Sequence, residues 1–138
     1  MQLAEQVGRR LRGGEVIELI SDLGGGKTVF VKGLARGMGI DEAVSSPSFT
    51  IKNVYPGPKL KLYHYDFYRL HEAGLLKEEI AEALQDPAGV VVIEWADVVK
   101  DLLPVQHLSV TVRPTNADER ELIFKGPDNL NYLFPNNT

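Results

Sequence analysis

Cysteine is absent from this chain of 138 residues. Disulfide bonds and thiolate metal sites are therefore excluded, and such a chain suits a reducing compartment. No apolar run approaches the roughly 20 residues that a membrane-spanning helix needs. The first residues also lack the charged and then apolar pattern of a signal peptide. We therefore expect a cytoplasmic protein that makes no membrane contact.

A strong positive charge is lacking as well. The formal net charge is −4 at pH 7, which argues against a broad, non-specific grip on nucleic acid. Any RNA contact is expected to be local, or to be made through a partner. Hydrophobic residues make up 43% and charged residues 25%, as in ordinary globular proteins. We expect one compact domain over residues 1–126 and a polar, asparagine-rich tail over 127–138 that could fray.

The strongest pattern present is SDLGGGKT at residues 21–28, between the hydrophobic run 16–20 and the amphipathic run 29–38. A strand that enters a glycine-rich turn and continues into a helix is typical of a phosphate-binding loop. The glycines let successive backbone N–H groups converge on an anion, and the positive end of the helix dipole faces the same place. The alternative is a glycine-rich turn with a surface lysine.

Two side chains at the end of this segment have specific predicted roles. Lys27 would reach the β- and γ-phosphates of a nucleotide, and the Thr28 hydroxyl is an oxygen ligand of the kind that Mg²⁺ accepts. Ser21 stands where the usual pattern has its first glycine. Serine suits that position if its φ is negative, which is plausible at the end of a strand.

Hydrophobic periodicity predicts alternating strands and helices, and hence an α/β fold. A first helix would bury Leu3, Val7 and Leu11. The helix after the loop would bury a stripe of five residues and stop at Gly37 and Gly39. That stripe consists of Phe30, Val31, Leu34, Ala35 and Met38. The further expected elements are strands 49–55 and 60–66 as a hairpin, a helical turn at 67–70, a helix at 76–84, strand 90–93, a helix at 98–103, and strands 107–113 and 120–125.

Glu94 follows the apolar strand 90–93 directly. Ligands of open α/β sheets lie at the C-terminal ends of parallel strands, so we expect Glu94 near the end of the strand that precedes the loop. A carboxylate in that place can hold Mg²⁺ directly or through water. The alternatives are that Glu94 pairs with a basic side chain, or that Asp97 is the acid, although Asp97 suits the start of the next helix better.

Asp66 also ends a strand and leaves two interpretations open. Its carboxylate could orient or deprotonate a water aimed at the γ-phosphate, or it could cap a following turn. Alternation places His64 and Asp66 on the same face of that strand. No third metal ligand has suitable spacing from His64 and His71, so we interpret both histidines as structural or solvated. Trp95 is interpreted as a core or rim aromatic, with stacking on a ligand as the alternative.

Four blocks in one order resemble the TsaE (YjeE) family of small bacterial P-loop ATPases, over roughly residues 3–126. They are SDLGGGKTVFVKGLARGMG, SSPSFTIKNVY, LYHYDFYRL and VVIEWAD. The resemblance implies a P-loop NTPase-like fold with a mixed central β-sheet flanked by helices, Mg-ATP binding and slow ATP hydrolysis. It also implies that the protein is the accessory ATPase of TsaB and TsaD in making N6-threonylcarbamoyladenosine in certain tRNAs.

Carried over by position, the resemblance implies a set of site residues. Asp66 and Glu94 would be catalytic, and Thr28 and Glu94 would bind Mg²⁺. Trp95 follows the acid as in the family. ATP would bind to Asp22, Leu23, Gly24, Gly25, Gly26, Lys27, Thr28, Val29 and Arg120. Ser46, Ser48 and Thr50 would form a switch-like segment. Three positions depart from the family pattern, namely Ser21, Gly25 and Ala4, and the last leaves the adenine contacts unassigned.

Two other functions share these features. A small-molecule kinase uses the same loop, metal and acids, although little sequence remains for a lid and an acceptor pocket. A nucleotide-dependent binding module with little hydrolysis cannot be separated from an ATPase by sequence. GTP is less favoured than ATP, because the chain has no N-K-x-D motif.

Overall fold

The computed structural model describes residues 2–20, 27–41, 44, 52–67, 76–114 and 120–134. The helices are α1 (Gln2–Arg10), α2 (Lys27–Gly37) and α3 (Leu76–Gln85), and the 3₁₀ helices are η1 (Ala96–Leu102) and η2 (Asp128–Leu133). The strands are β1 (Val16–Ile20), β2 (Lys52–Pro56), β3 (Lys61–Asp66), β4 (Gly89–Glu94), β5 (Leu108–Pro114) and β6 (Arg120–Lys125). None of the helices in these ranges is long and apolar enough to cross a membrane.

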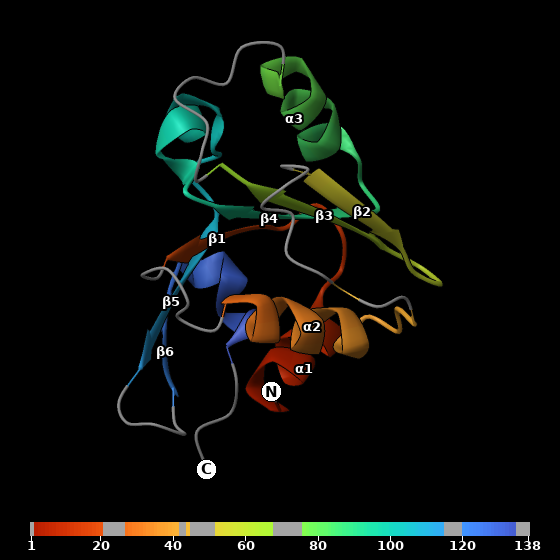
Figure 1. Ribbon diagram of the computed structural model, residues 1–138, viewed down its shortest axis with the longest axis vertical. Helices are drawn as coiled ribbons and strands as arrows, with labels where there is room; N and C mark the ends of the chain where they lie inside the picture. Colours follow the sequence, from red (N-terminus) through yellow and green to blue (C-terminus); the bar gives the residue numbers. More distant parts are fainter. Residues whose placement is uncertain are drawn as a thin grey trace.

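The strands form one mixed sheet in the order β2-β3-β4-β1-β5-β6 (Figure 1). The central strands β3, β4, β1 and β5 run parallel, and the edge strands β2 and β6 pair with them antiparallel. The hairpin predicted around residues 56–59 is confirmed by the pairing of β2 with β3. Parallel strands need helical crossovers, which here place helices on both faces of the sheet.

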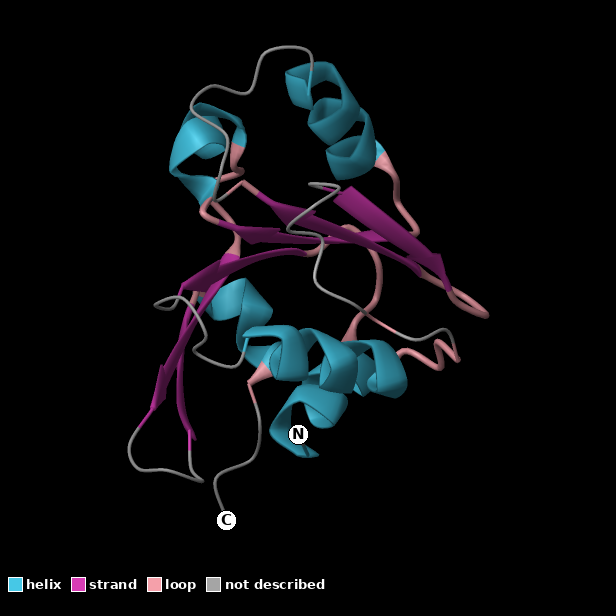
Figure 2. Cartoon of the chain, viewed as in Figure 1, coloured by secondary structure: helices cyan, strands magenta, loops and turns pink. Residues whose placement is uncertain are grey.

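Figure 2 shows the sheet between two layers of helices. One hydrophobic cluster joins α1, α2 and η2 to one face, and a second joins α3 and η1 to the other. Alternation along β3 divides its residues between the two clusters, with Leu62 in the first and Tyr65 in the second. The predicted α/β class and the mixed sheet flanked by helices are both confirmed.

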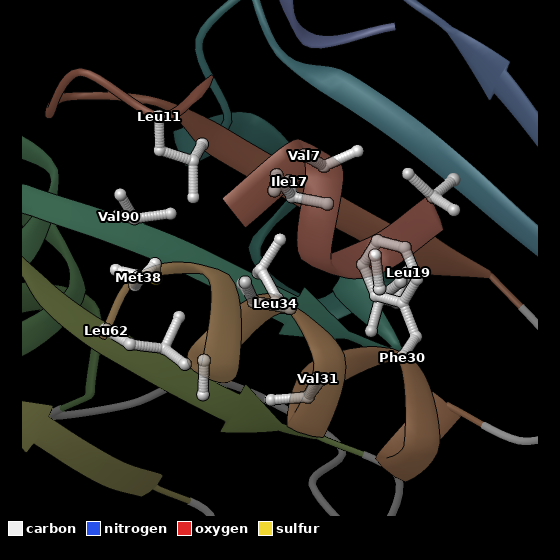
Figure 3. Packing of buried hydrophobic residues seen from close by; sticks show 14 of the residues in the cluster. Val7, Leu11, Ile17, Leu19, Phe30, Val31, Leu34, Met38, Leu62 and Val90 are labelled. Atoms are coloured by element: carbon white, nitrogen blue, oxygen red, sulfur yellow. The ribbon is translucent and has the colours of Figure 1, made fainter. Parts of the chain in front are cut away.

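Helix α2 buries the stripe that its sequence predicts. Phe30, Val31 and Leu34 are buried and point toward the sheet strands in Figure 3, whereas Lys32 is exposed on the outer side. The helix ends in a left-handed Gly39 with φ of 80°, and the Ile40 N–H donates to the carbonyl of Ala35 at 3.0 Å. This C-terminal motif confirms the stop predicted at Gly39.

The predicted buried face of α1 is partly wrong. Leu3 is 39% exposed, whereas Ala4 and Gly8 are buried with Val7. Small residues face α2 because the two helix backbones nearly touch. A Cβ added to Gly8 would lie 2.3 Å from the carbonyl oxygen of Leu34. Close packing of α1 against α2 therefore determines which face of α1 is buried. Hydrophobic periodicity does not reveal such packing.

Gly37 is the last residue of α2, in agreement with the predicted stop, and it also serves the packing of the helix. A Cβ at this position would lie 2.2 Å from the carbonyl oxygen of Glu5 in α1. Only glycine fits such a backbone contact without a shift of one helix.

The fraying that the sequence suggests after Gly126 is wrong for residues 128–133. They form η2, which buries Leu130 and Leu133 in the cluster shared with α1 and α2. The Arg10 guanidinium donates to the carbonyl oxygen of Phe134 at 2.5 Å. Two leucines spaced three residues apart thus help to anchor a short helix to the core, despite its asparagines. The helical turn predicted at 67–70 lies mostly outside the described residues.

Candidate functional site

The candidate site lies at one edge of the sheet, where parallel strands end. Glu94 is the last residue of β4, and the register pairs it with Leu19 of β1 on one side and with Asp66 of β3 on the other. The Phe67 N–H donates to the Glu94 carbonyl at 3.1 Å, so the pairing of β3 with β4 continues past both acids. The prediction that Glu94 lies near the end of β1 is confirmed as geometry, and Asp66 lies one strand further away, on the other side of β4.

Both acids are buried. Asp66 is 6% exposed and Glu94 is 3% exposed. Residues in register on neighbouring parallel strands point to the same face, about 5 Å apart. This face carries Leu19 and α2, because β1 and α2 share one hydrophobic cluster. Two ionised carboxylates at this spacing repel each other, and a divalent cation offsets the repulsion.

The donor set suits Mg²⁺. Mg²⁺ is commonly held by one or two carboxylates together with substrate phosphates and water, rather than by an all-protein cage. Where residues are described, no group of three or more His, Cys, Asp or Glu side chains forms a metal site. Glu94 therefore offers an oxygen ligand of a site that a phosphate would complete, with Asp66 as a second carboxylate beside it.

Helix α2 begins at Lys27 on the same face as the two acids. Its first turn lies near the end of β1, because Phe30 packs with Leu19 in one cluster (Figure 3). Thr28 is partly buried and Val29 is 48% exposed. The free N–H groups of this helix end make it suitable for binding an anion.

Several predicted residues lie outside the described part of the chain. They are Asp22, Leu23, Gly24, Gly25 and Gly26 of the loop, Ser46, Ser48 and Thr50 of the switch-like segment, and His71. Lys27 and Arg120 are placed by their backbone alone, and so is the rival acid Asp97. Their predicted roles stay predictions.

Arg120 lies at the same edge of the sheet. It opens β6 and pairs with Pro114, the last residue of β5. Since Ile20 at the end of β1 pairs with Thr111, Arg120 lies beyond the end of β1. The fold thus directs the predicted C-terminal arginine to the edge that carries the two acids.

His64 is the residue that sequence reasoning undervalued. Its imidazole is fully buried, and its Nε2 lies 2.5 Å from Oε2 of Glu94. The register pairs His64 with Val92, so the contact with Glu94 runs diagonally across two strands. The signal was available, because alternation already placed His64 on the face of Asp66. His64 is a buried structural residue, as interpreted from the sequence, and it also contacts Glu94, an acid of the candidate site.

Trp95 follows Glu94 in a left-handed conformation, with φ of 58° and ψ of 54°. It is the one non-glycine residue with positive φ in the described ranges. Its side chain is partly buried and packs against the second cluster. This packing agrees with the interpretation of Trp95 as a core or rim aromatic. A bulky residue in this conformation is strained, and such strain is often found at functional sites.

A family model described as "Threonylcarbamoyl adenosine biosynthesis protein TsaE" matches residues 1–122. The chain belongs to the TsaE family. A TsaE protein of Bacillus subtilis is 38% identical over 117 residues, which cover 84% of this chain and 72% of that protein. A TsaE protein of Treponema pallidum is 42% identical over 116 residues, which cover 84% of this chain and 85% of that protein.

A solved structure supports the same conclusion for the fold. The crystal structure of Bacillus subtilis YdiB matches this TsaE-family chain with a TM-score of 0.75 and 33% sequence identity. The match covers 95% of this chain and 81% of YdiB. The resemblance to TsaE and the P-loop-type fold predicted from the sequence are both confirmed.

Proposed function

We propose that this TsaE-family protein binds Mg-ATP at the C-terminal edge of its parallel strands and hydrolyses the nucleotide slowly. The observation that carries the proposal is the pair of buried acids, Asp66 and Glu94, which are in register with each other, with Glu94 also in register with Leu19 near the end of β1. The glycine-rich segment and α2 follow that end directly. Buried like charges next to a helix N-terminus suit a cation and a polyphosphate bound together.

Each chain residue has a separate task in this proposal. The backbone amides of residues 24–28 and the Lys27 ammonium hold the β- and γ-phosphates. Thr28 and Glu94 would hold Mg²⁺, and the ion would supply positive charge against the phosphate oxygens. Asp66 orients the attacking water and accepts its proton. Arg120 faces the nucleotide, and residues 46–50 respond to the γ-phosphate.

The wider role follows from the family. We propose that the protein takes part in the biosynthesis of threonylcarbamoyladenosine in tRNA, as the names of its relatives state for them. Its partners would be TsaB- and TsaD-type proteins, and it would meet tRNA through that complex. The net charge of −4 suits contact through partners better than direct binding of RNA.

Nucleotide binding is tested by calorimetric titration with Mg-ATP. We expect heat of binding with the wild type and none with Lys27→Ala. Lys32→Ala is the matched control, because Lys32 is an exposed lysine of the same helix. Absence of binding by the wild type, or equal loss in both variants, would contradict the proposal.

Partner coupling is tested by measuring phosphate release with and without a TsaB–TsaD pair and substrate tRNA. Stimulation by the complete mixture supports an accessory ATPase. Binding of Mg-ATP without any phosphate release in that mixture favours a nucleotide-dependent binding module instead. Phosphate that appears on an added alcohol favours a kinase.

A further inference from the structure

We propose that His64 is a positioning residue for Glu94, which it holds in the orientation that binds the cation accompanying ATP. The contact is short and dry. His64 Nε2 lies 2.5 Å from Glu94 Oε2, and the two side chains are 0% and 4% exposed. This inference rests on the proposed function, since it gives His64 a task at the same site.

The hydrogen bonding of the imidazole favours one tautomer. His64 Nδ1 is buried and has no hydrogen-bond partner among the residues that the structure describes. A buried N–H without an acceptor costs more than a buried lone pair of a neutral ring nitrogen. The proton therefore belongs on Nε2, which donates it to the Glu94 carboxylate. A hydrogen bond of this kind fixes the orientation of a carboxylate that would hold a cation.

The strand pairing makes His64 a rigid support. Strand β3 lies between β2 and β4, and His64 pairs with Asn53 on one side and Val92 on the other. Its neighbours on the same face, Leu62 and Val92, belong to the larger hydrophobic cluster. The imidazole is fully buried on a paired strand, and its contact with Glu94 therefore restricts the orientation of that carboxylate.

His64 also couples the two acids. Asp66 is two residues further along the same strand, on the same face, and Glu94 is its register partner. A backbone link to Asp66 and a hydrogen bond to Glu94 thus fix both acids relative to one imidazole. Outer hydrogen bonds of this kind commonly change metal affinity about 10- to 100-fold.

The test compares His64→Leu, which removes the donor, with His64→Gln, whose amide can donate from near the position of Nε2. ATP binding is measured by the fluorescence of Trp95, the only tryptophan of the chain, at increasing Mg²⁺. We expect His64→Leu to bind metal-free ATP like the wild type and to need at least about tenfold more Mg²⁺ for its metal-dependent binding. His64→Gln should stay within about threefold of the wild type.

His107→Leu is the matched control. His107 Nε2 also contacts a glutamate, Oε1 of Glu18 at 3.2 Å, but this pair is partly exposed, and His107 precedes β5 at the opposite edge of the sheet. The variant should leave the Mg²⁺ requirement unchanged. Equal effects of His107→Leu and His64→Leu would overturn the inference, and so would an unchanged Mg²⁺ requirement in His64→Leu.

A double-mutant cycle separates positioning from general damage. In a Glu94→Gln background, His64→Leu should have no further effect on the Mg²⁺ requirement, because both changes act through one carboxylate. Independent, additive losses would show that His64 does not act through Glu94 and would overturn the proposal.

If His64→Leu does not fold, the positioning role of His64 can be tested on the wild-type protein. Nitrogen-15 spectra of the imidazoles should show the Nε2–H tautomer for His64. Addition of Mg²⁺ to the ATP-bound protein should shift the His64 Nε2 resonance and leave His107 in place. No shift at His64 while Mg²⁺ strengthens ATP binding overturns the positioning role alone. If Mg-ATP does not bind to the wild type at all, the proposed function itself has failed.

Discussion

Glu15 and Glu94 are both buried glutamates, and they lie at opposite edges of the sheet. Glu15, 5% exposed, precedes β1. Its carboxylate accepts the backbone N–H groups of Arg12 and Gly13, each at 2.7 Å, and the Tyr132 hydroxyl at 2.6 Å. Glu94, 3% exposed, ends β4, touches His64 and lies in register with a second buried acid, Asp66.

The difference separates a carboxylate that serves stability from one that serves binding. Glu15 is surrounded by donors from the loop after α1 and from η2, so its charge is satisfied within the fold. The edge around Glu94 instead brings two buried carboxylates, Glu94 and Asp66, into register near the end of β1. Carboxylates gathered in this way are commonly found at functional sites.

The largest expected effect is at the Glu94 edge. Asp66→Ala should lower the rate of ATP hydrolysis at least about 100-fold, because a water-orienting base contributes that much or more. ATP affinity should remain near that of the wild type, since the loop and Lys27 are intact. Single-turnover hydrolysis and calorimetric titration measure the two quantities.

The control for Asp66→Ala is Asp101→Ala, which removes an exposed acid that pairs with Lys77 at 3.5 Å. It should leave both rate and affinity unchanged. Normal turnover by Asp66→Ala would refute the catalytic assignment of Asp66. The acids at the Glu94 edge would then not differ from Glu15 in serving catalysis.

At the Glu15 edge the expected effect is on stability. Glu15→Gln should lower the free energy of unfolding by about 2 kcal/mol, because two charge-assisted hydrogen bonds from backbone amides are weakened. Hydrolysis per folded molecule should not change. Urea denaturation gives the stability, with the exposed Glu82→Gln as control. Unchanged stability, or a loss of activity in fully folded Glu15→Gln, would contradict the contrast.

Tyr132→Phe should have a smaller effect of the same kind. The variant removes one of the three donors to Glu15 and leaves both backbone amides in place. We expect the free energy of unfolding to fall by about 1 kcal/mol. Because the hydroxyl joins η2 to the loop after α1, amide hydrogen exchange in residues 128–133 should also become faster. Exchange rates equal to those of the wild type would show that Leu130 and Leu133 alone hold η2.

The smallest expected effect is at alkaline pH. Burial and the hydrogen bond to Glu15 raise the pKa of Tyr132 from 10.0 to about 12. Between these values the unfolded chain has lost the tyrosine proton and the folded protein retains it, so stability falls as pH rises from 10 toward 12. Urea midpoints at pH 9, 10 and 11 should fall less steeply for Tyr132→Phe. Identical slopes would show that Tyr132 titrates normally.

The sequence predicted the elements better than it predicted their contacts. The continuous apolar run 90–93 followed by Glu94 identified a central strand and its acidic end, and the stripe of α2 identified the face that packs on the sheet. Both predictions depend on periodicity within one element. The glycine-rich motif, the strand-end acids and the family resemblance supplied the expected nucleotide and metal roles, which the fold accommodates without testing them.

Contacts between elements escaped prediction because they depend on packing. The backbone contact of Gly8 with Leu34 selects Ala4 rather than Leu3 as a buried residue of α1. Likewise, the Glu15–Tyr132 hydrogen bond joins residues 117 positions apart in the sequence. The diagonal His64–Glu94 contact needs the parallel register of β3 and β4, which a single sequence does not specify.

The most direct measurement is a crystal structure of the protein with Mg²⁺ and a non-hydrolysable ATP analogue. Our account predicts terminal phosphates against the backbone of residues 24–28, and Mg²⁺ about 2.1 Å from a carboxylate oxygen of Glu94 or one water away from it. Asp66 should face the γ-phosphate. A nucleotide bound elsewhere, or phosphates and metal that touch neither acid, would contradict it.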